Sequence, residues 1–240
     1  MRRALVTGGA KGIGLSVAER LRAAGFAVAI LGRDGAALAA AGFAGRVADV
    51  TDAAGFGGAI EALGPFDVLV NNAGAAVAAP FGRQSRADWD GMLAVNLTAC
   101  FTACQCVLPG MVARGWGRIV TVASTAGLKG YAYTAAYCAA KHGVIGLTRA
   151  LAVETATTGV TVNAVCPGFT DTAMVERAAA VIAGKRGTSE AAARAALAQM
   201  SPQGRLVQPG EVADVVAYLC GEGTGSITGQ SLAVAGGEVM

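Results

Sequence analysis

Three polar residues within one stretch have the types and spacing needed to move a proton to or from a carbonyl group. The stretch runs from Ser124 to Lys141 and reads STAGLKGYAYTAAYCAAK. Tyr137 and Lys141 are four residues apart in an alanine-rich run that predicts a helix, so both side chains project from one helix face. A phenol has a pKa of about 10, and a nearby cation lowers it by favouring the phenolate. Such a phenol can exchange a proton near neutral pH.

Ser124 adds a hydroxyl group to this pair. It follows the apolar run from Arg118 to Ala123, which predicts a strand. A hydroxyl at the carboxyl end of that strand could meet the phenol and the ammonium group at one point. The pattern also fits a buried tyrosine beside a lysine whose stem packs on a core helix. Because Tyr-x-x-x-Lys alone is common, the rest of the chain must decide between the two interpretations.

The length and composition favour a single α/β domain over residues 1–240. Of the 240 residues, 54% are apolar and 5% are aromatic, so alanine, valine and leucine form most of the core. A net charge of +3 is too small and too dispersed for a nucleic-acid surface. No apolar segment with a cleavage site precedes the first predicted strand, so a secretory signal is not expected.

Neither a membrane span nor a metal site is expected. The uncharged run from Gly91 to Ala113 is long enough to cross a bilayer, but it contains Asn96 and Pro109, and we interpret it as a buried core or interface helix. The six cysteines show no paired spacing with histidines, and His142 is the only histidine, so no metal is expected. Reduced thiols packed as small hydrophobes agree with a cytoplasmic location.

A glycine-rich turn near the start of the chain predicts a phosphate site. The apolar run Arg3 to Thr7 predicts a strand, and Leu15 begins a helical pattern. Between them lie Gly8, Gly12 and Gly14, whose absent side chains let a pyrophosphate approach the amides of the helix start. The spacing G-x-x-x-G-x-G differs from the commoner G-x-G-x-x-G, and without Gly-Lys-Ser/Thr it is no Walker A loop.

The second predicted strand, Phe26 to Leu31, bears on the choice of cofactor. An acidic residue at its end would accept a hydrogen bond from the adenosine ribose, whereas an arginine suits a 2′-phosphate. Gly32 occupies the acidic position, Arg33 follows it, and Lys11 lies in the glycine turn. These two cations favour NADP(H) over NAD(H). The alternative is that Arg33 is simply solvated and Asp34 binds the ribose.

Two further strands end in polar residues. The run from Arg46 to Val50 carries Asp49, which could meet the adenine amino group or could instead form a turn or cap before the next helix. The run from Phe66 to Val70 leads into Asn71-Asn72-Ala73-Gly74, where small and amide residues allow close approach of a cofactor.

The alternation of strands and helices predicts a doubly wound parallel sheet with helices on both faces. Later strands are expected over 160–166 and 230–235, and helices over 86–109, 137–157 and 210–220. Residues 173–204 have no strand character and predict one or two helices that form a substrate lid. Ligands bind beyond the carboxyl ends of such strands, so the polar segments that follow the strands should meet at one edge. They are Gly8–Gly14, Asn71–Gly74, Ser124 and Pro167–Thr172.

The joint pattern resembles the short-chain dehydrogenase/reductase family over essentially the whole chain. The residues that carry the resemblance are Thr7, Gly8, Gly12 and Gly14, Asn71-Asn72-Ala73-Gly74, Asn96, Ser124, Tyr137, Lys141 and Pro167-Gly168. It implies one Rossmann domain with a seven-stranded sheet. The runs GWGRIVTVASTAG and TGVTVNAVCPGFTDTAM are most similar to 3-oxoacyl reductases, including acetoacetyl-CoA reductases and aromatic polyketide ketoreductases. Thr121 departs from the family, in which many members carry Asn.

By this resemblance, Tyr137 is the general acid in ketone reduction and the base in alcohol oxidation. Lys141 lowers the pKa of Tyr137 and bonds the nicotinamide ribose, Ser124 polarises the carbonyl, and Asn96 holds a water that links Lys141 to solvent. The resemblance also implies a homotetramer and a set of cofactor contacts. These are Gly12, Ile13 and Gly14 at the pyrophosphate, Asp49 and Val50 at the adenine, Asn72 with Ala73 and Gly74 on the adenosine side, and Pro167, Gly168, Thr170 and Thr172 toward the nicotinamide end.

Three functions are consistent with these residues. The first is an NADPH-dependent reductase of a 3-oxoacyl thioester or similar ketone. The second is an NAD-dependent dehydrogenase of a 3-hydroxyacyl compound or another secondary alcohol. The third is a cofactor-binding regulator that has lost turnover, but a protein without catalysis has no need for the full set of Asn96, Ser124, Tyr137 and Lys141. The resemblance alone suggests the substrate class, since fold does not fix function.

Overall fold

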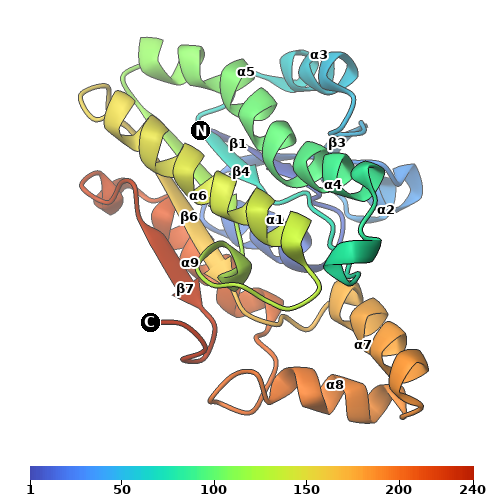
Figure 1. Cartoon of the computed structure of the whole chain (residues 1–240). Helices are drawn as coiled ribbons and strands as arrows, with labels where there is room; N and C mark the ends of the chain where they lie inside the picture. The colour runs from blue at the N-terminus through green and yellow to red at the C-terminus, as the bar shows by residue number, and fades with distance from the viewer.

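The computed structural model describes residues 1–240, in which strands and helices alternate along the chain (Figure 1). The strands are β1 (Arg3–Thr7), β2 (Ala27–Gly32), β3 (Ala44–Val47), β4 (Val68–Asn71), β5 (Gly117–Val122), β6 (Val160–Pro167) and β7 (Ser231–Val234). The α-helices are α1 (Gly12–Ala23), α2 (Gly35–Ala40), α3 (Ala53–Leu63), α4 (Arg86–Leu93), α5 (Ala99–Ala113), α6 (Ala135–Glu154), α7 (Ala173–Arg186), α8 (Glu190–Ala198) and α9 (Pro209–Leu219). Short 3-10 turns are η1 (Phe81–Arg83), η3 (Thr125–Gly127) and η4 (Glu222–Thr224), and η2 (Ala94–Thr98) is a π-helical turn.

The strands form one seven-stranded parallel sheet in the order β3-β2-β1-β4-β5-β6-β7. This confirms the doubly wound sheet predicted from the sequence. The order reverses between β1 and β4, and a sheet of this kind binds ligands at the carboxyl ends of the strands beside such a reversal. The loops after β1 and β4 therefore lie next to each other at the expected binding edge.

Helices bury both faces of the sheet. Along β1, Ala4 and Val6 belong to a core shared with α1 and α9, whereas Leu5 between them faces the core under α3 and α5. Strands that are covered on both faces read as continuous apolar runs, as β1 does. Figure 1 shows α5 and α6 on the near side of the sheet and α1 behind it.

The helix predicted over 86–109 is instead three joined pieces, α4, η2 and α5, and it continues past Pro109 to Ala113. This stretch, Arg86–Ala113, is long and apolar enough to cross a bilayer, and 39% of its most apolar window is buried. Length and composition alone are weak evidence for a membrane span, because core helices meet the same criteria. The inner side packs as a core helix should, since Ala103 and Met111 of α5 are fully buried against the sheet.

The third strand begins two residues earlier and ends three residues earlier than predicted. β3 ends at Val47 because its neighbour β2 ends at Gly32, with which Val47 pairs. Asp49 therefore lies in the loop after the strand.

Residues 173–204 contain two helices, α7 and α8, which project from the body at the lower right of Figure 1. They bury a small core of their own, in which Val175 and Ala179 of α7 meet Ala193 and Leu197 of α8. Gly187, with φ 65°, ends α7 and turns the chain.

Candidate active site

Tyr137 and Lys141 project from the same face of α6, as predicted. The Lys141 ammonium lies 5.7 Å from the centre of the Tyr137 ring. Its side chain is buried, and Nζ donates a 3.0 Å hydrogen bond to the main-chain carbonyl of Val122, the last residue of β5. The lysine is thus fixed to the end of the strand that leads into Ser124, and the three predicted catalytic residues share one region.

Ser124 begins the turn η3. Its Oγ accepts a 3.1 Å hydrogen bond from the amide of Ala126, and it thereby caps the turn. Because the hydroxyl acts as acceptor here, its own proton is left to donate to a ligand. The turn packs directly on α6: a side chain at Gly127 would meet the main-chain carbonyl of Lys141 at 2.8 Å.

Asn96 is fully buried in the π-helical turn η2. Its amide nitrogen donates to the carbonyls of Ala75 (2.9 Å) and Met92 (3.1 Å), and its oxygen accepts from the amide of Ala75 at 3.3 Å. A Cβ on Gly74 would lie 2.8 Å from the Asn96 oxygen and 3.8 Å from Lys141 Nζ. The asparagine therefore holds the loop after β4 against the lysine. Its main-chain carbonyl accepts from the Cys100 thiol at 3.3 Å and has a second lone pair for the predicted water.

The glycine turn has the shape that a pyrophosphate needs. Gly8 and Gly12 have positive φ values of 63° and 53°. A Cβ on Gly14 would lie 2.2 Å from the carbonyl oxygen of Gly8, so no side chain fits there. The first turn of α1 has neither a side-chain cap nor an acidic residue, which leaves its amides available to an anion. These residues fit a dinucleotide.

Thr7, to which the sequence analysis gave no separate role, holds two loops of the candidate site together. Its Oγ accepts hydrogen bonds of 3.0 Å from the amides of both Asn72 and Ala73, and so joins the loop after β4 to the end of β1. Asn72 completes this link, because its side-chain amide donates to the carbonyls of Thr7 and Gly8. A hydroxyl at the end of an apolar strand was the available signal.

The two cations predicted to select NADP(H) both have carboxylate partners. Lys11 Nζ lies 2.6 Å from Asp34, and Arg33 lies 3.9 Å from Asp49. The bond to Lys11 holds the pKa of the Asp34 carboxyl below its usual value, and Asp34 also caps α2 by accepting from Ala37. Hydrogen bonds from Thr51 lower the pKa of Asp49, which forms the turn that the alternative interpretation expected.

The loop after β6 reaches the glycine turn. A Cβ on Gly12 would lie 3.3 Å from the methyl group of Thr172. Thr170 is buried and donates to the carbonyl of Gly168 at 3.0 Å. The predicted nicotinamide-end residues, Pro167 to Thr172, thus lie at the same sheet edge as the predicted pyrophosphate residues.

Aromatic residues stand beside this edge. The rings of Tyr131 and Phe169 meet edge to face, with centres 6.1 Å apart. Tyr133 has a positive φ of 69°, which is strained for a residue with a side chain, and its carbonyl accepts a hydrogen bond from Ala79. The loops before α6 and after β4 are thereby joined.

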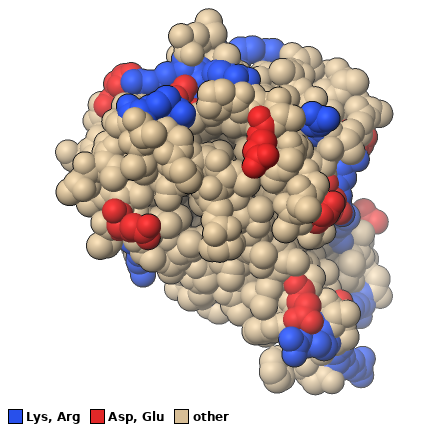
Figure 2. Space-filling view, turned by 90° about the horizontal axis from the view of Figure 1, so that it is seen from above, with Lys and Arg blue, Asp and Glu red and all other residues tan.

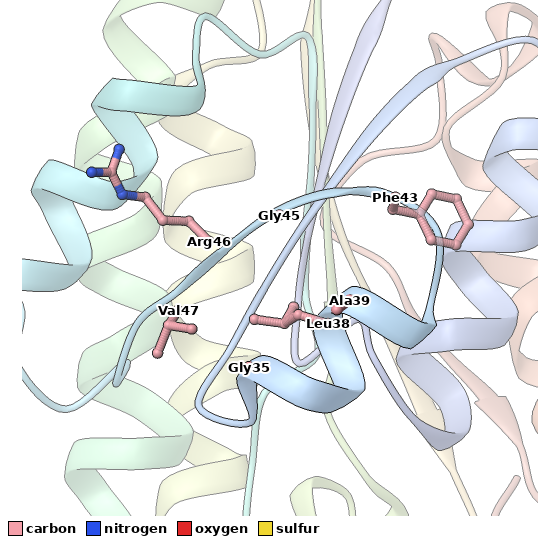
Figure 3. A pocket seen from close by; sticks show the side chains of 7 residues that line it. All are labelled: Gly35, Leu38, Ala39, Phe43, Gly45, Arg46 and Val47. Carbon is pink, nitrogen blue, oxygen red and sulfur yellow. The ribbon is translucent and has the colours of Figure 1, made fainter.

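A shallow hollow of about 220 Å³ elsewhere on the surface is not this site. Figure 3 shows it between α2 and β3, at the outer edge of the sheet. Gly35, Leu38 and Val47 are among its lining residues, and none of the predicted site residues lines it.

Several known proteins are similar to this chain in sequence. A family model described as short chain dehydrogenase matches residues 2–183. An acetoacetyl-CoA reductase of Shinella zoogloeoides is 38% identical, over 99% of this chain and 98% of its own. A D-beta-hydroxybutyrate dehydrogenase of Cupriavidus necator is also 38% identical, over 98% and 97%. A crystal structure of a single-residue variant of actinorhodin polyketide ketoreductase with NADPH superposes with a TM-score of 0.92 at 40% identity, over 99% of this chain and 97% of that one.

Proposed function

The chain belongs to the short-chain dehydrogenase family, as its motifs predicted, and is an oxidoreductase; we propose that it reduces a 3-oxoacyl thioester or similar ketone with NADPH. The observation that carries this proposal is that two groups of residues lie at the same edge of the sheet. One is the bare, glycine-lined start of α1, and the other is the group formed by Ser124, Tyr137 and Lys141.

In the reductive direction, each residue of the group has one task. Ser124 donates a hydrogen bond to the carbonyl oxygen, and Tyr137 gives its proton to that oxygen as the carbon is reduced. Lys141 stabilises the phenolate that remains. The bound nicotinamide supplies the hydride. We assign to the main-chain carbonyl of Asn96 the water that returns a proton toward Lys141.

The residues that would hold the cofactor are those that gather along the same edge. The proposed contacts are Gly8, Lys11, Gly12, Ile13, Gly14, Arg33, Asp49, Val50, Asn72, Ala73, Gly74, Tyr137, Lys141, Pro167, Gly168, Thr170 and Thr172. The family uses NAD(P), and the preference for NADP(H) rests on Lys11 and Arg33 and on the NADPH of the related ketoreductase structure. The ion pairs of both cations are exposed, so a phosphate can take the place of the carboxylates.

A second function is oxidation of a 3-hydroxyacyl compound or another secondary alcohol with NAD. The similar D-beta-hydroxybutyrate dehydrogenase supports it at the same identity as the acetoacetyl-CoA reductase. The catalytic residues serve both directions, since Tyr137 would then accept the proton.

The test is a panel of 3-oxoacyl thioesters, simple ketones and their alcohols, followed by nicotinamide absorbance with each cofactor. We expect acetoacetyl-CoA with NADPH to have the highest kcat/KM, at least about tenfold above NADH, which equals about 1.4 kcal/mol. A preference for NAD with an alcohol would establish the second function, and no turnover with any pair would refute both.

We also propose that residues 1–240 act as one catalytic domain with α7 and α8 as a substrate lid. The helices pack chiefly on each other, and Arg194 of α8 pairs with Asp171 at 2.6 Å, at the base of the segment. That pair would set the resting position of the lid. Arg194 also lies 2.9 Å from Glu176, so it links both lid helices to the base of the segment.

A homotetramer agrees with the outer surface of the long helix. Figure 2 shows that the face seen from above is mostly uncharged, with one acidic side chain well inside it and most other charged side chains toward its edges. Phe101 and Val112 of α5 are exposed apolar side chains. A low content of charge at the centre is typical of interfaces between subunits, and light scattering of the purified protein would test the tetramer. A cytoplasmic location stays a prediction.

A further inference from the structure

A buried carboxylate near the C-terminus lies beside the candidate active site and has no role in the function proposed above. The side chain of Glu238 is 1% exposed. One carboxylate oxygen accepts a 2.5 Å hydrogen bond from the phenol of Tyr131, and the other has no partner. Lys129 lies 3.2 Å from the first oxygen and also donates to the main-chain carbonyl of Glu238. A buried carboxylate is costly unless it is paired and hydrogen-bonded, and here Lys129 and Tyr131 supply partners for one oxygen only.

A chain of hydrogen bonds links Glu238 through Tyr131 to the residue next to Ser124. The Tyr131 phenol also lies 2.6 Å from the hydroxyl of Thr125, which follows Ser124 directly. Each hydroxyl has one proton. Since the carboxylate can only accept, Tyr131 donates to Glu238 and Thr125 donates to the Tyr131 oxygen.

Burial and the bond to Glu238 raise the pKa of the Tyr131 phenol, so it stays a donor across the working pH range. The direction of donation in the chain is therefore fixed, and the Thr125 hydroxyl is kept turned toward Tyr131.

The same residues join three strand ends. Tyr131 lies after β5, Phe169 against which its ring packs lies after β6, and Glu238 lies after β7. A Cβ on Gly168 would lie 2.9 Å from the free oxygen of Glu238, so the carboxylate is packed directly against the loop after β6. Ser201 holds the same C-terminal segment through the carbonyl of Gly236.

We propose that Glu238 is a positioning residue that, through Tyr131 and Thr125, fixes the turn carrying Ser124 against the carbonyl of the substrate. The inference rests on the proposed function, because it is the role of Ser124 there that Glu238 supports. Small displacements of a positioned group reduce turnover strongly. Of the proposed cofactor contacts only Gly168 lies against Glu238, whereas the glycines at the start of α1 lie elsewhere, so cofactor binding should change little.

Kinetics of three variants test this role. We expect Glu238→Ala and Tyr131→Phe each to lower kcat about tenfold and to leave the KM for the cofactor within about twofold. Glu238→Gln keeps an oxygen that accepts from Tyr131, so its kcat should stay within about threefold of the wild type. Glu61→Ala, at an exposed position of α3, is the control and should change nothing. Wild-type kcat in both Glu238→Ala and Tyr131→Phe would overturn the proposal.

A double variant separates positioning of Ser124 from general damage. In a Ser124→Ala background the hydrogen-bond chain of Glu238, Tyr131 and Thr125 has no Ser124 hydroxyl to position. Glu238→Ala should then lower kcat by less than about twofold. An equal loss in both backgrounds would overturn the proposal. If Glu238→Ala does not fold, Tyr131→Phe takes its place in the same comparison.

Amide hydrogen exchange gives a readout that does not depend on activity. Glu238→Ala and Tyr131→Phe should accelerate exchange over residues 124–131 and leave α3 unchanged. If the wild type reduces no ketone, the proposed function fails. Faster exchange of the two variants, confined to this turn, would still support the role of Glu238 in fixing the turn. Unchanged exchange there would overturn it.

Discussion

The two ends of the candidate site hold their polar side chains in different ways. At the catalytic end, Asn96 and Lys141 are buried, and their partners are main-chain groups of Ala75, Met92 and Val122. At the adenosine end, the side chains of Lys11 and Arg33 are 70% and 77% exposed, and each pairs with an exposed carboxylate.

This difference separates what the fold determines from what single substitutions can change. Main-chain partners are fixed by the sheet and the helices, so the catalytic geometry follows from the fold. Exposed ion pairs contribute about 0–1 kcal/mol and weaken with salt, so they can exchange partners when a charged ligand arrives. Catalysis should therefore be sensitive to changes at the first end, and cofactor choice should be adjustable at the second.

The largest effect is expected at Tyr137. Replacement by phenylalanine removes the proton that passes to the carbonyl oxygen and keeps the ring, so kcat should fall by about 10²–10⁴ while the protein still folds. Tyr218→Phe on α9 makes the same chemical change at an exposed position and should have no effect. Steady-state kinetics measure both, and near wild-type turnover by Tyr137→Phe would remove the tyrosine from the mechanism.

Next in size is a paired change of two buried amides. Asn96→Ala leaves main-chain groups of Ala75 and Met92 without partners and should lower the free energy of unfolding by about 2 kcal/mol or more. Asn163→Ala on β6 removes an equally buried amide that bonds Ile227 and Gln230. Urea unfolding should show a similar decrease in the free energy of unfolding for both variants.

Only the first of these two variants should lower kcat at temperatures where both are folded. A comparable loss of turnover in Asn163→Ala would mean that kcat follows stability alone, and the distinction between the catalytic end and the rest of the core would fail.

At the adenosine end, Lys11→Ala and Arg33→Ala should change cofactor choice without changing stability. Each removes a cation from the predicted 2′-phosphate site, so the ratio of kcat/KM for NADPH over NADH should fall about tenfold. The free energy of unfolding, measured in urea, should change by no more than about 0.5 kcal/mol, because both side chains are exposed. An unchanged cofactor ratio in both variants would show that the cations do not contact the phosphate.

The smallest effect is expected at Asp34. Asp34→Asn keeps a side chain that can cap α2 but removes the charge that pairs with Lys11. The freed lysine should raise the preference for NADPH about two- to fivefold, and the gain should shrink as salt is added. A shift toward NADH would instead mean that Lys11 must be held by Asp34 in order to contact the 2′-phosphate.

Local patterns were sufficient to predict most of the elements and the shared helix face of the candidate catalytic pair. The spacing of Tyr137 and Lys141 fixes their shared helix face, and the alternation of strands and helices fixes the edge at which Ser124 meets them. Apolar runs predicted the ends of six strands to within one or two residues. The strand β3 is exposed at the edge of the sheet and has a weaker apolar pattern, so its predicted position was wrong by two to three residues.

Long-range contacts could not be predicted in this way. Tyr131 and Glu238 are 107 residues apart, and nothing near either one in the sequence points to the other. The π-helical turn at Asn96 depends on packing against the loop after β4, so the sequence indicated only a continuous helix. The carboxylate partners of Lys11 and Arg33 escaped prediction because exposed side chains choose among several neighbours.

The most direct test of the account is a crystal structure of the protein with NADP⁺ bound. We expect the pyrophosphate to lie on the amides of the first turn of α1. We also expect the Tyr137 hydroxyl and the Lys141 ammonium to lie within about 3.5 Å of the nicotinamide ribose. A nicotinamide ring bound away from Tyr137, with the phenol facing another part of the protein, would contradict the account.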